Sequence, residues 1–202
     1  MSKVGLYFGS FNPVHNGHIA IAGYMLEFTG LGEIWFVVSP HNPLKKKETL
    51  LDNYQRLHMI NLAIGNNDRM KASDIEFRLP VPSYTIDTIA YLEEKHPNHR
   101  FSLIMGEDNL YTLHKWKNAA ELVRKCQIWV YPRHDAVKPA TLLLEQILSG
   151  ADVHFVKAPL MDISGTFIRN GVKKGKNMSY FLPAPVWKYI EEMHFYEPPT
   201  FP

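Results

Sequence analysis

Two histidines and two glycines lie close together near the amino terminus, in the segment GSFNPVHNGH at residues 9–18. Gly9 and Ser10 allow backbone N–H groups to approach an anion closely. His15 and His18 lie three residues apart, so at the start of a helix both rings can point toward one place and donate N–H groups to phosphate oxygens. The segment therefore predicts a phosphate-binding loop.

Two other interpretations of these histidines stay open at this point. In the first, one ring caps the helix and the other packs in the interior. In the second, both imidazoles bind a metal ion, but the loop offers no cysteine or carboxylate to complete the set of ligands. We therefore assign no metal ligand.

A second polar segment, ISGTFIR at residues 163–169, has its own chemistry. At the start of a helix, Ser164 and Thr166 provide hydroxyls beside free N–H groups, and Arg169 offers a planar cationic fork that suits phosphate. The alternative is a capped surface helix with a solvated arginine.

Alternating apolar and amphipathic segments must position these residues. Continuously apolar runs predict strands buried on both faces, as in a parallel sheet, at 3–8, 33–39, 100–105, 127–131 and 152–156. Helical periodicity falls between and after them, at 18–29, 53–64, 84–95, 117–125, 140–148 and 184–195. The pattern predicts a doubly wound α/β fold with a mainly parallel sheet, in which residues 9–18 form the first strand-to-helix turn, a preferred site for phosphate.

Local signals place several helix ends. Asp52, followed three residues later by Gln55, resembles a capping box, and Gly30 and Gly65 follow helical runs where a left-handed cap is expected.

Composition restricts the class of protein. The 202 residues, 46% of them hydrophobic, predict one domain over 1–202, with 163–202 as its small helical C-terminal part. A net charge of +2 argues against a nucleic-acid partner, and no apolar stretch has the length of a membrane span. With Cys126 as the single cysteine, we expect a reducing, cytoplasmic location.

The two polar segments resemble the G-x-F-x-P-x-H-x-G-H and I-S-x-T-x-I-R signatures of the nucleotidyltransferase superfamily, whose Rossmann-like members transfer a nucleoside monophosphate to a phosphorylated acceptor. Every fixed position is matched. Over nearly the whole chain, the sequence is similar to the bacterial nicotinate mononucleotide adenylyltransferase family, as PSYTIDT at 82–88, MGEDNL at 105–110, Trp116 and YPR at 131–133 illustrate.

The resemblance implies transfer of AMP from ATP to nicotinate mononucleotide in NAD biosynthesis, with Mg²⁺ arriving with the ATP. It implies that the catalytic residues are His15, His18 and Arg169. The ATP contacts that it implies are Gly9, Ser10, Phe11, His15, His18, Gly106, Asp108, Ser164, Thr166 and Arg169. The acceptor contacts that it implies are Lys45, Lys46, Thr85, Trp116 and Arg133.

The residues of this second half of the site have suitable chemistry. The indole of Trp116 can stack on a pyridinium, and N–H groups around Thr85 at a helix start suit a carboxylate. After the strand at 100–105, Gly106 leaves room for a ligand and Asp108 can accept from ribose hydroxyls. Trp116 as a packing aromatic and Asp108 as a helix N-cap are the alternatives.

Two departures from the family pattern leave questions open. Where the family has P-P-H-K or P-P-H-R, this chain has NPLKKK at 42–47, so the lysine that meets phosphate is one of Lys45, Lys46 and Lys47. Gly165 replaces a more usual serine or alanine.

Other functions remain as alternatives. A sibling enzyme would act on nicotinamide mononucleotide or phosphopantetheine, and PSYT with Trp116 favours the first of these two acceptors. A nucleotide-sensing module would bind without turnover. The sequence does not determine how strictly the enzyme chooses between the acid and the amide acceptor, or the order in which the substrates bind. It also leaves the oligomeric state open, and a homo-oligomer is one possibility.

Overall fold

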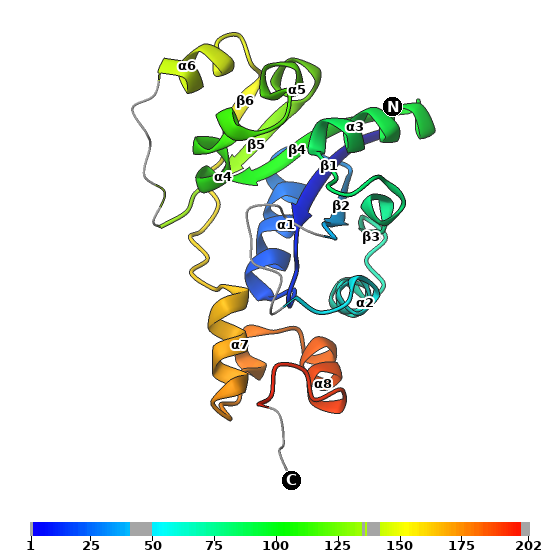
Figure 1. The fold of residues 1–202 in the computed structure, drawn as a ribbon, viewed down its shortest axis with the longest axis vertical. Coiled ribbons are helices and arrows are strands. Elements are labelled where there is room, and N and C mark those ends of the chain that lie inside the picture. Colours follow the sequence, from blue (N-terminus) through cyan, green and yellow to red (C-terminus); the bar gives the residue numbers. More distant parts are fainter. Residues whose placement is uncertain (1, 41–49, 135, 137–141, 199–202) are drawn as a thin grey trace.

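The computed structural model describes residues 2–40, 50–134, 136 and 142–198. Its centre is a six-stranded sheet in the order β3-β2-β1-β4-β5-β6, and every neighbouring pair is parallel (Figure 1). The strands are β1 (Ser2–Gly9), β2 (Glu33–Val38), β3 (Met70–Ser73), β4 (His99–Gly106), β5 (Gln127–Tyr131) and β6 (Val153–Phe155). The order reverses between β1 and β4, and sheets of this kind bind ligands beyond the carboxyl ends of the strands at that point.

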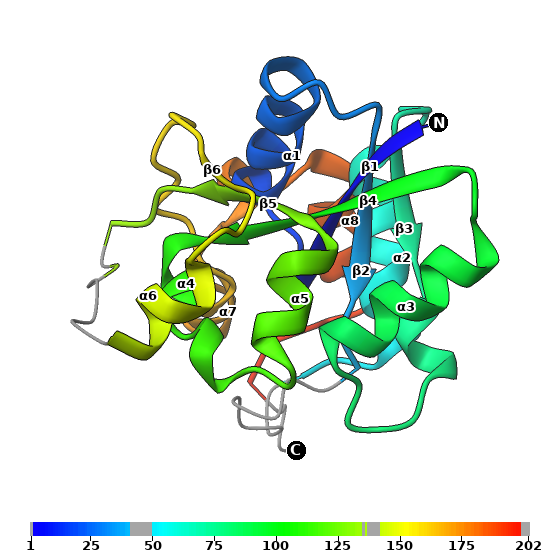
Figure 2. The ribbon, with the colours of Figure 1, turned by 90° about the horizontal axis from the view of Figure 1, so that it is seen from above.

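Helices cover both faces of the sheet, as Figure 2 shows from above. They are α1 (Asn16–Phe28), α2 (Asn53–Ile64), α3 (Thr85–Lys95), α4 (Glu107–Tyr111), α5 (Ala119–Lys125), α6 (Leu142–Leu148), α7 (Gly165–Lys173) and α8 (Ala184–Glu192), with 3₁₀ turns η1 (Ile75–Arg78), η2 (Leu113–Lys115) and η3 (Ser179–Phe181). One core joins α1, α2, α7 and α8 to the sheet, and a second joins α3, α5 and α6 to its other face. The predicted doubly wound α/β fold is confirmed.

The five predicted strands and the predicted helices are present: the strand at 127–131 and the helix at 53–64 have the predicted ends, and the others differ at one or both ends. Residues 140 and 141 of the helix predicted at 140–148 lie outside the residues that the structure describes. Helix α1 begins at residue 16 rather than 18, α5 begins at 119 because Asn118 takes a left-handed conformation (φ 50°), and α8 ends at 192. The sequence reasoning missed β3, an edge strand of four residues in which only Met70 is buried, and α4, which follows β4 without a turn. Short elements of this kind carry too few residues to show a period.

The predicted helix ends agree with the structure in position, though not in every detail. Gly30 and Gly65 have positive φ angles of 74° and 54°, which favour glycine, but the ψ angle of −129° takes Gly65 out of the left-handed helical region. Asp52 is the N-cap residue of α2, and its carboxylate accepts from the backbone N–H of Tyr54 (2.8 Å) rather than from that of Gln55, as a capping box would require.

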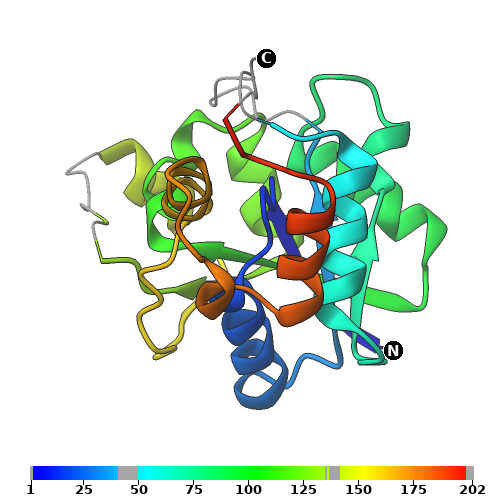
Figure 3. The same cartoon turned by 90° about the horizontal axis from the view of Figure 1, so that it is seen from below.

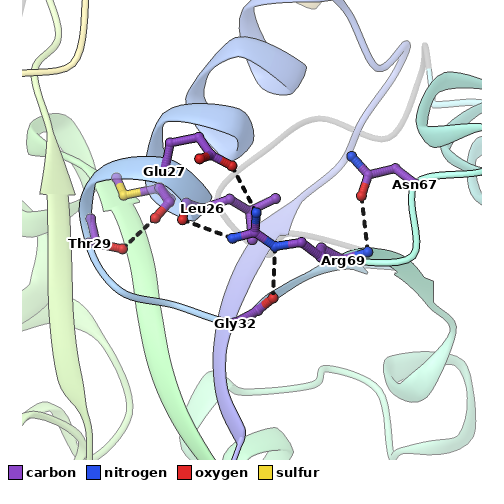
Figure 4. Close-up of polar contacts among 7 residues, drawn as sticks. Leu26, Glu27, Thr29, Gly32, Asn67 and Arg69 are labelled. Carbon is purple, nitrogen blue, oxygen red and sulfur yellow. Dashed lines mark hydrogen bonds and ion pairs between the residues drawn. The ribbon is translucent and has the colours of Figure 1, made fainter.

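Arg69 ties the end of α1 to the loop before β3 (Figure 4). Its guanidinium donates to the carbonyls of Leu26 (3.0 Å) and Gly32 (3.3 Å) and pairs with the Glu27 carboxylate (2.8 Å). A cation at a helix C-terminus satisfies carbonyls that have no partner inside the helix. This contact fixes α1, whose other end carries the histidines.

The two C-terminal helices lie beyond the carboxyl end of β1, and α8 runs beside α2 (Figures 1 and 3). Their buried residues, Ile168, Val172, Val186 and Ile190, belong to the first core. None of the helices that the structure describes is long and apolar enough to cross a membrane.

Candidate active site

The phosphate-binding loop predicted at 9–18 joins β1 to α1 at the point where the strand order reverses. Phe11 anchors this loop: its ring is buried with 2% exposure and packs edge-on against Tyr7, Phe36 and His18. A Cβ at Gly9 would stand 2.8 Å from the Phe11 ring, so glycine is needed there for packing. Because the Phe11 side chain is in the core, only its backbone remains for contact with a nucleotide.

The two histidine rings are stacked, with centroids 3.6 Å apart, so the structure brings them together as the spacing suggests. His15 is the N-cap residue of α1 and is 4% exposed, while His18 is only partly buried. The backbone N–H of His15 donates to Nδ1 of His18 (3.2 Å). The proton of a neutral His18 therefore sits on Nε2, which makes Nε2 a hydrogen-bond donor. The capping and the burial that the first alternative interpretation assigned to these histidines are both present, and these contacts fix the two rings.

Burial, and to a smaller extent the nearby Arg133 guanidinium, together lower the pKa of His15 from its ordinary value of 6.5 to about 3. His15 is therefore neutral at physiological pH in the free protein. Gly17 allows this ring to lie against α1, since a Cβ there would stand 3.1 Å from Nδ1 of His15.

Helix α7 brings the second polar segment to the same loop. Nη1 of Arg169 donates to the backbone carbonyl of Asn12 (2.7 Å), and Nη2 donates to the hydroxyl of Thr166 (3.2 Å). Ser164 is the N-cap of α7, as the capping interpretation required, because its Oγ accepts from the N–H of Phe167 (3.1 Å). Arg169 is thus fixed between helix and loop, 157 residues from its partner.

Gly165 explains how close α7 comes to the loop. A Cβ at this first residue of α7 would stand 2.8 Å from the carbonyl oxygen of Asn12 and 3.1 Å from Nη1 of Arg169. A side chain of any size would push helix and loop apart. Glycine in place of the serine or alanine of the family pattern therefore coincides with a tight contact between the start of α7 and the loop.

The third predicted segment follows β4 and β5. Arg133 lies 3.8 Å (Nε to Oδ1) from Asp108, its backbone N–H donates to Glu107 (3.2 Å), and its guanidinium faces the Tyr131 ring (5.4 Å). The space beside Gly106 is filled by the Asp108 and Arg133 side chains. The alternative role for Asp108 is wrong, because Gly106 is the N-cap of α4.

Two of the predicted acceptor residues, Thr85 and Trp116, lie on segments that meet. Helix α3 begins at Thr85, and Trp116 follows η2, half-buried against the second core. Lys117 joins the segments: its Nζ pairs with the Asp87 carboxylate (2.8 Å) and lies 4.7 Å from the centroid of the Tyr84 ring. The Trp116 loop is thus held against the first turn of α3.

Two buried charged residues that sequence reasoning missed support the site. Arg56, with 0% exposure, donates to the carbonyls of Ser10 (2.6 Å) and Ser39 (3.0 Å), and burial lowers its pKa to about 10. Glu76 accepts from the hydroxyl of Thr88 in α3 (2.8 Å), and burial raises its pKa. A signal for Arg56 existed, because it shares a helix face with the apolar Met59 and Ile60.

Lys45, Lys46 and Lys47, the candidates for phosphate contact after β2, lie outside the residues that the structure describes. Their assignment stays a prediction.

A parallel sheet with the predicted phosphate-binding loop at its switch point, beside a helix that carries an arginine, is the arrangement expected of the nucleotidyltransferase class of α/β enzymes. Comparison with known proteins agrees. The model of the cytidylyltransferase-like family matches residues 6–171. Two relatives, from Flavobacterium psychrophilum and Flavobacterium johnsoniae, are named "probable nicotinate-nucleotide adenylyltransferase" and are 52% and 53% identical to this chain; in both cases the match covers 96% of this chain and 99% of the relative.

A solved structure of lower identity shares the fold. The nicotinic acid mononucleotide adenylyltransferase of Plasmodium falciparum, complexed with NaAD, superposes with a TM-score of 0.78 at 19% identity, over 97% of this chain and 98% of that one. The chain therefore belongs to the cytidylyltransferase-like family and, within it, to the nicotinate-nucleotide adenylyltransferases.

Proposed function

We propose that this enzyme transfers the AMP group of ATP to nicotinate mononucleotide, which yields nicotinate adenine dinucleotide and pyrophosphate for NAD biosynthesis. The observation that carries the proposal is the convergence of His18 and Arg169 on one loop at the switch point of the sheet. The names of the relatives that match nearly the full chain supply the substrates.

The proposed reaction is an in-line attack by the acceptor phosphate on the α-phosphorus of ATP, with pyrophosphate leaving. In this proposal the proton on Nε2 of His18 and the guanidinium of Arg169 would stabilise the charge that develops on the phosphate oxygens, and the hydrogen bonds that hold the two side chains support these roles. His15 stacks on His18 and holds its ring in place. Gly9, Ser10, Phe11, Gly106, Asp108, Ser164 and Thr166 complete the proposed ATP site.

A covalent enzyme intermediate has no support in the described residues. Burial raises the pKa of the Cys126 thiol to about 12, so the thiolate needed for attack is absent at physiological pH. The oxygen of Ser164 already accepts the N–H that caps α7. Direct transfer between the two substrates needs neither side chain.

The acceptor would lie where the Trp116 loop meets the start of α3, with Arg133 and Lys45 or Lys46 meeting its phosphate. The first N–H groups of α3, around Thr85, have no partner inside the helix, so they suit the carboxylate of the acid form. The amide form would point an NH₂ donor at these donors. Such a buried mismatch costs about 1–3 kcal/mol.

Mg²⁺ would enter with ATP, and we propose no resident metal site. The described residues contain no group of three His, Cys, Asp or Glu side chains that could hold a metal ion. When bound, Mg²⁺ neutralises charge on the phosphates and keeps several waters. The single, buried Cys126 supports a cytoplasmic location.

Pyrophosphate release tests this function. We expect release with ATP and nicotinate mononucleotide, and a kcat/KM at least about tenfold lower with the nicotinamide form. Equal efficiencies, or a preference for the amide, would contradict the proposed acceptor site. Turnover with phosphopantetheine alone would identify the sibling enzyme. Binding of ATP without release of pyrophosphate in any mixture would favour the sensing module.

A further inference from the structure

Asn12, in the middle of the phosphate-binding loop, accepts hydrogen bonds from three distant parts of the chain. Its backbone carbonyl accepts from Nη1 of Arg169 (2.7 Å), and its side-chain Oδ1 accepts from the hydroxyl of Tyr196 (2.8 Å) and from the N–H of Leu51 (3.3 Å). Asn12 is buried, with 5% of the residue exposed. The Arg169 contact is therefore made to a residue that other segments hold in place.

Tyr196 reaches Asn12 from the segment that follows α8, 184 residues along the chain. Its φ angle of 66° is unusual for a residue other than glycine, and Phe195 beside it is buried in the first core. Burial raises the pKa of the Tyr196 phenol. The hydroxyl therefore keeps its proton and acts as a donor to Asn12.

We propose that Tyr196 is a positioning residue for adenylyl transfer: its hydroxyl fixes Asn12, and Asn12 in turn fixes the guanidinium of Arg169 against the triphosphate. This inference rests on the proposed function for the role of Arg169. In this proposal the segment after α8 contributes to the nucleotide site through Tyr196, which positions Asn12 and Arg169.

The geometry predicts that removal of the Tyr196 hydroxyl weakens the positioning of Arg169. With the hydroxyl removed, Asn12 loses the shorter of the hydrogen bonds that Oδ1 accepts from Tyr196 (2.8 Å) and Leu51 (3.3 Å). Asn12 can then shift, and the carbonyl that holds Nη1 of Arg169 shifts with it. The ring of a phenylalanine at position 196 would still fill the same space, so folding should be preserved.

The test compares the wild-type protein with Tyr196→Phe. We expect kcat/KM for ATP to fall about three- to tenfold, the range for one intramolecular hydrogen bond, while KM for the acceptor changes little. Tyr189→Phe is the matched control. That ring packs on His58 and Phe195, and within the described part of the chain its hydroxyl has no hydrogen-bond partner.

A double substitution distinguishes positioning from a merely structural role. In an Arg169→Lys background, which loses the two-pronged contact, Tyr196→Phe should cost less than about twofold, because the residue through which it acts is already impaired. An equal fold-loss in both backgrounds, an unchanged kcat/KM for ATP, or an equal loss in Tyr189→Phe would overturn the proposal.

Binding of a non-hydrolysable ATP analogue, measured by calorimetry, keeps this test separate from the proposed function. If the wild-type protein released no pyrophosphate with nicotinate mononucleotide, the proposed function would fail. A weaker affinity for the analogue in Tyr196→Phe would still support the positioning role, and an unchanged affinity would refute it.

Discussion

Protonation of His15 should make the folded protein sensitive to mild acid. The ring is buried, and its pKa is lowered from 6.5 to about 3 in the folded state. The unfolded chain therefore binds a proton at His15 below about pH 6.5, whereas the folded protein does not. The stabilisation is fully present above pH 6.5 and is lost progressively as the pH falls toward 3.

The magnitude follows from the pH interval. One pKa unit corresponds to about 1.4 kcal/mol, so lowering the pH from about 6.5 to about 5 removes about 2 kcal/mol of stability through His15 alone. This figure does not depend on how far below 5 the folded-state pKa lies, because the buried ring is neutral at pH 5 in either case. A loss of 2 kcal/mol is a large part of the stability of a typical domain.

Urea unfolding at about pH 8 and about pH 5 measures this contribution when the wild type is compared with His15→Gln. The titration of acidic residues affects both proteins alike, so the difference between the two losses of stability reports on His15. We expect the wild type to lose about 2 kcal/mol more than the variant. His58→Gln, which removes an exposed imidazole and leaves His15 in place, should keep the wild-type dependence. Equal losses in wild type and His15→Gln, or protonation of the His15 ring above pH 5 in an NMR titration, would refute the argument.

Three further predictions concern activity. His18→Ala should lower kcat on the order of 10²–10³-fold in a folded protein, because it removes a hydrogen-bond donor for the charge that develops on the phosphates. The control His58→Ala should keep the wild-type kcat. An unaltered kcat of His18→Ala in steady-state assays would contradict the assignment. Trp116→Ala should raise KM for the mononucleotide much more than KM for ATP, and a parallel change in both would favour a packing role for the indole. Gly165→Ala should lower kcat/KM for ATP by about tenfold, because the new Cβ would press on the Asn12 carbonyl and on Nη1 of Arg169. The control is Gly23→Ala in α1, which should leave activity unchanged and raise the melting temperature, because nothing lies within 4 Å of its new Cβ. A fully active Gly165→Ala would show that the contact relaxes freely.

The order of strands and helices and the position of the phosphate loop were determined by the sequence itself. Apolar runs such as β1 and β4 are buried on both faces, so their composition shows it directly. In the same way, the spacing of His15 and His18 within one helical turn is a local property, and the structure stacks the two rings. Sequence reasoning worked where the physical cause lies within a few residues and the element is long enough to show a period, which β3 and α4 are not.

Only the tertiary structure decided what holds the site in place. Arg56 reaches Ser10 across 46 residues, Arg169 reaches Asn12 across 157, and Tyr196 reaches Asn12 across 184. No local pattern encodes such pairings, because each depends on the packing of α2, α7 and the segment after α8 around one loop. Gly165 illustrates the same limit: the sequence shows only a departure from the family pattern, and the structure shows that a Cβ there would stand 2.8 Å from the Asn12 carbonyl oxygen.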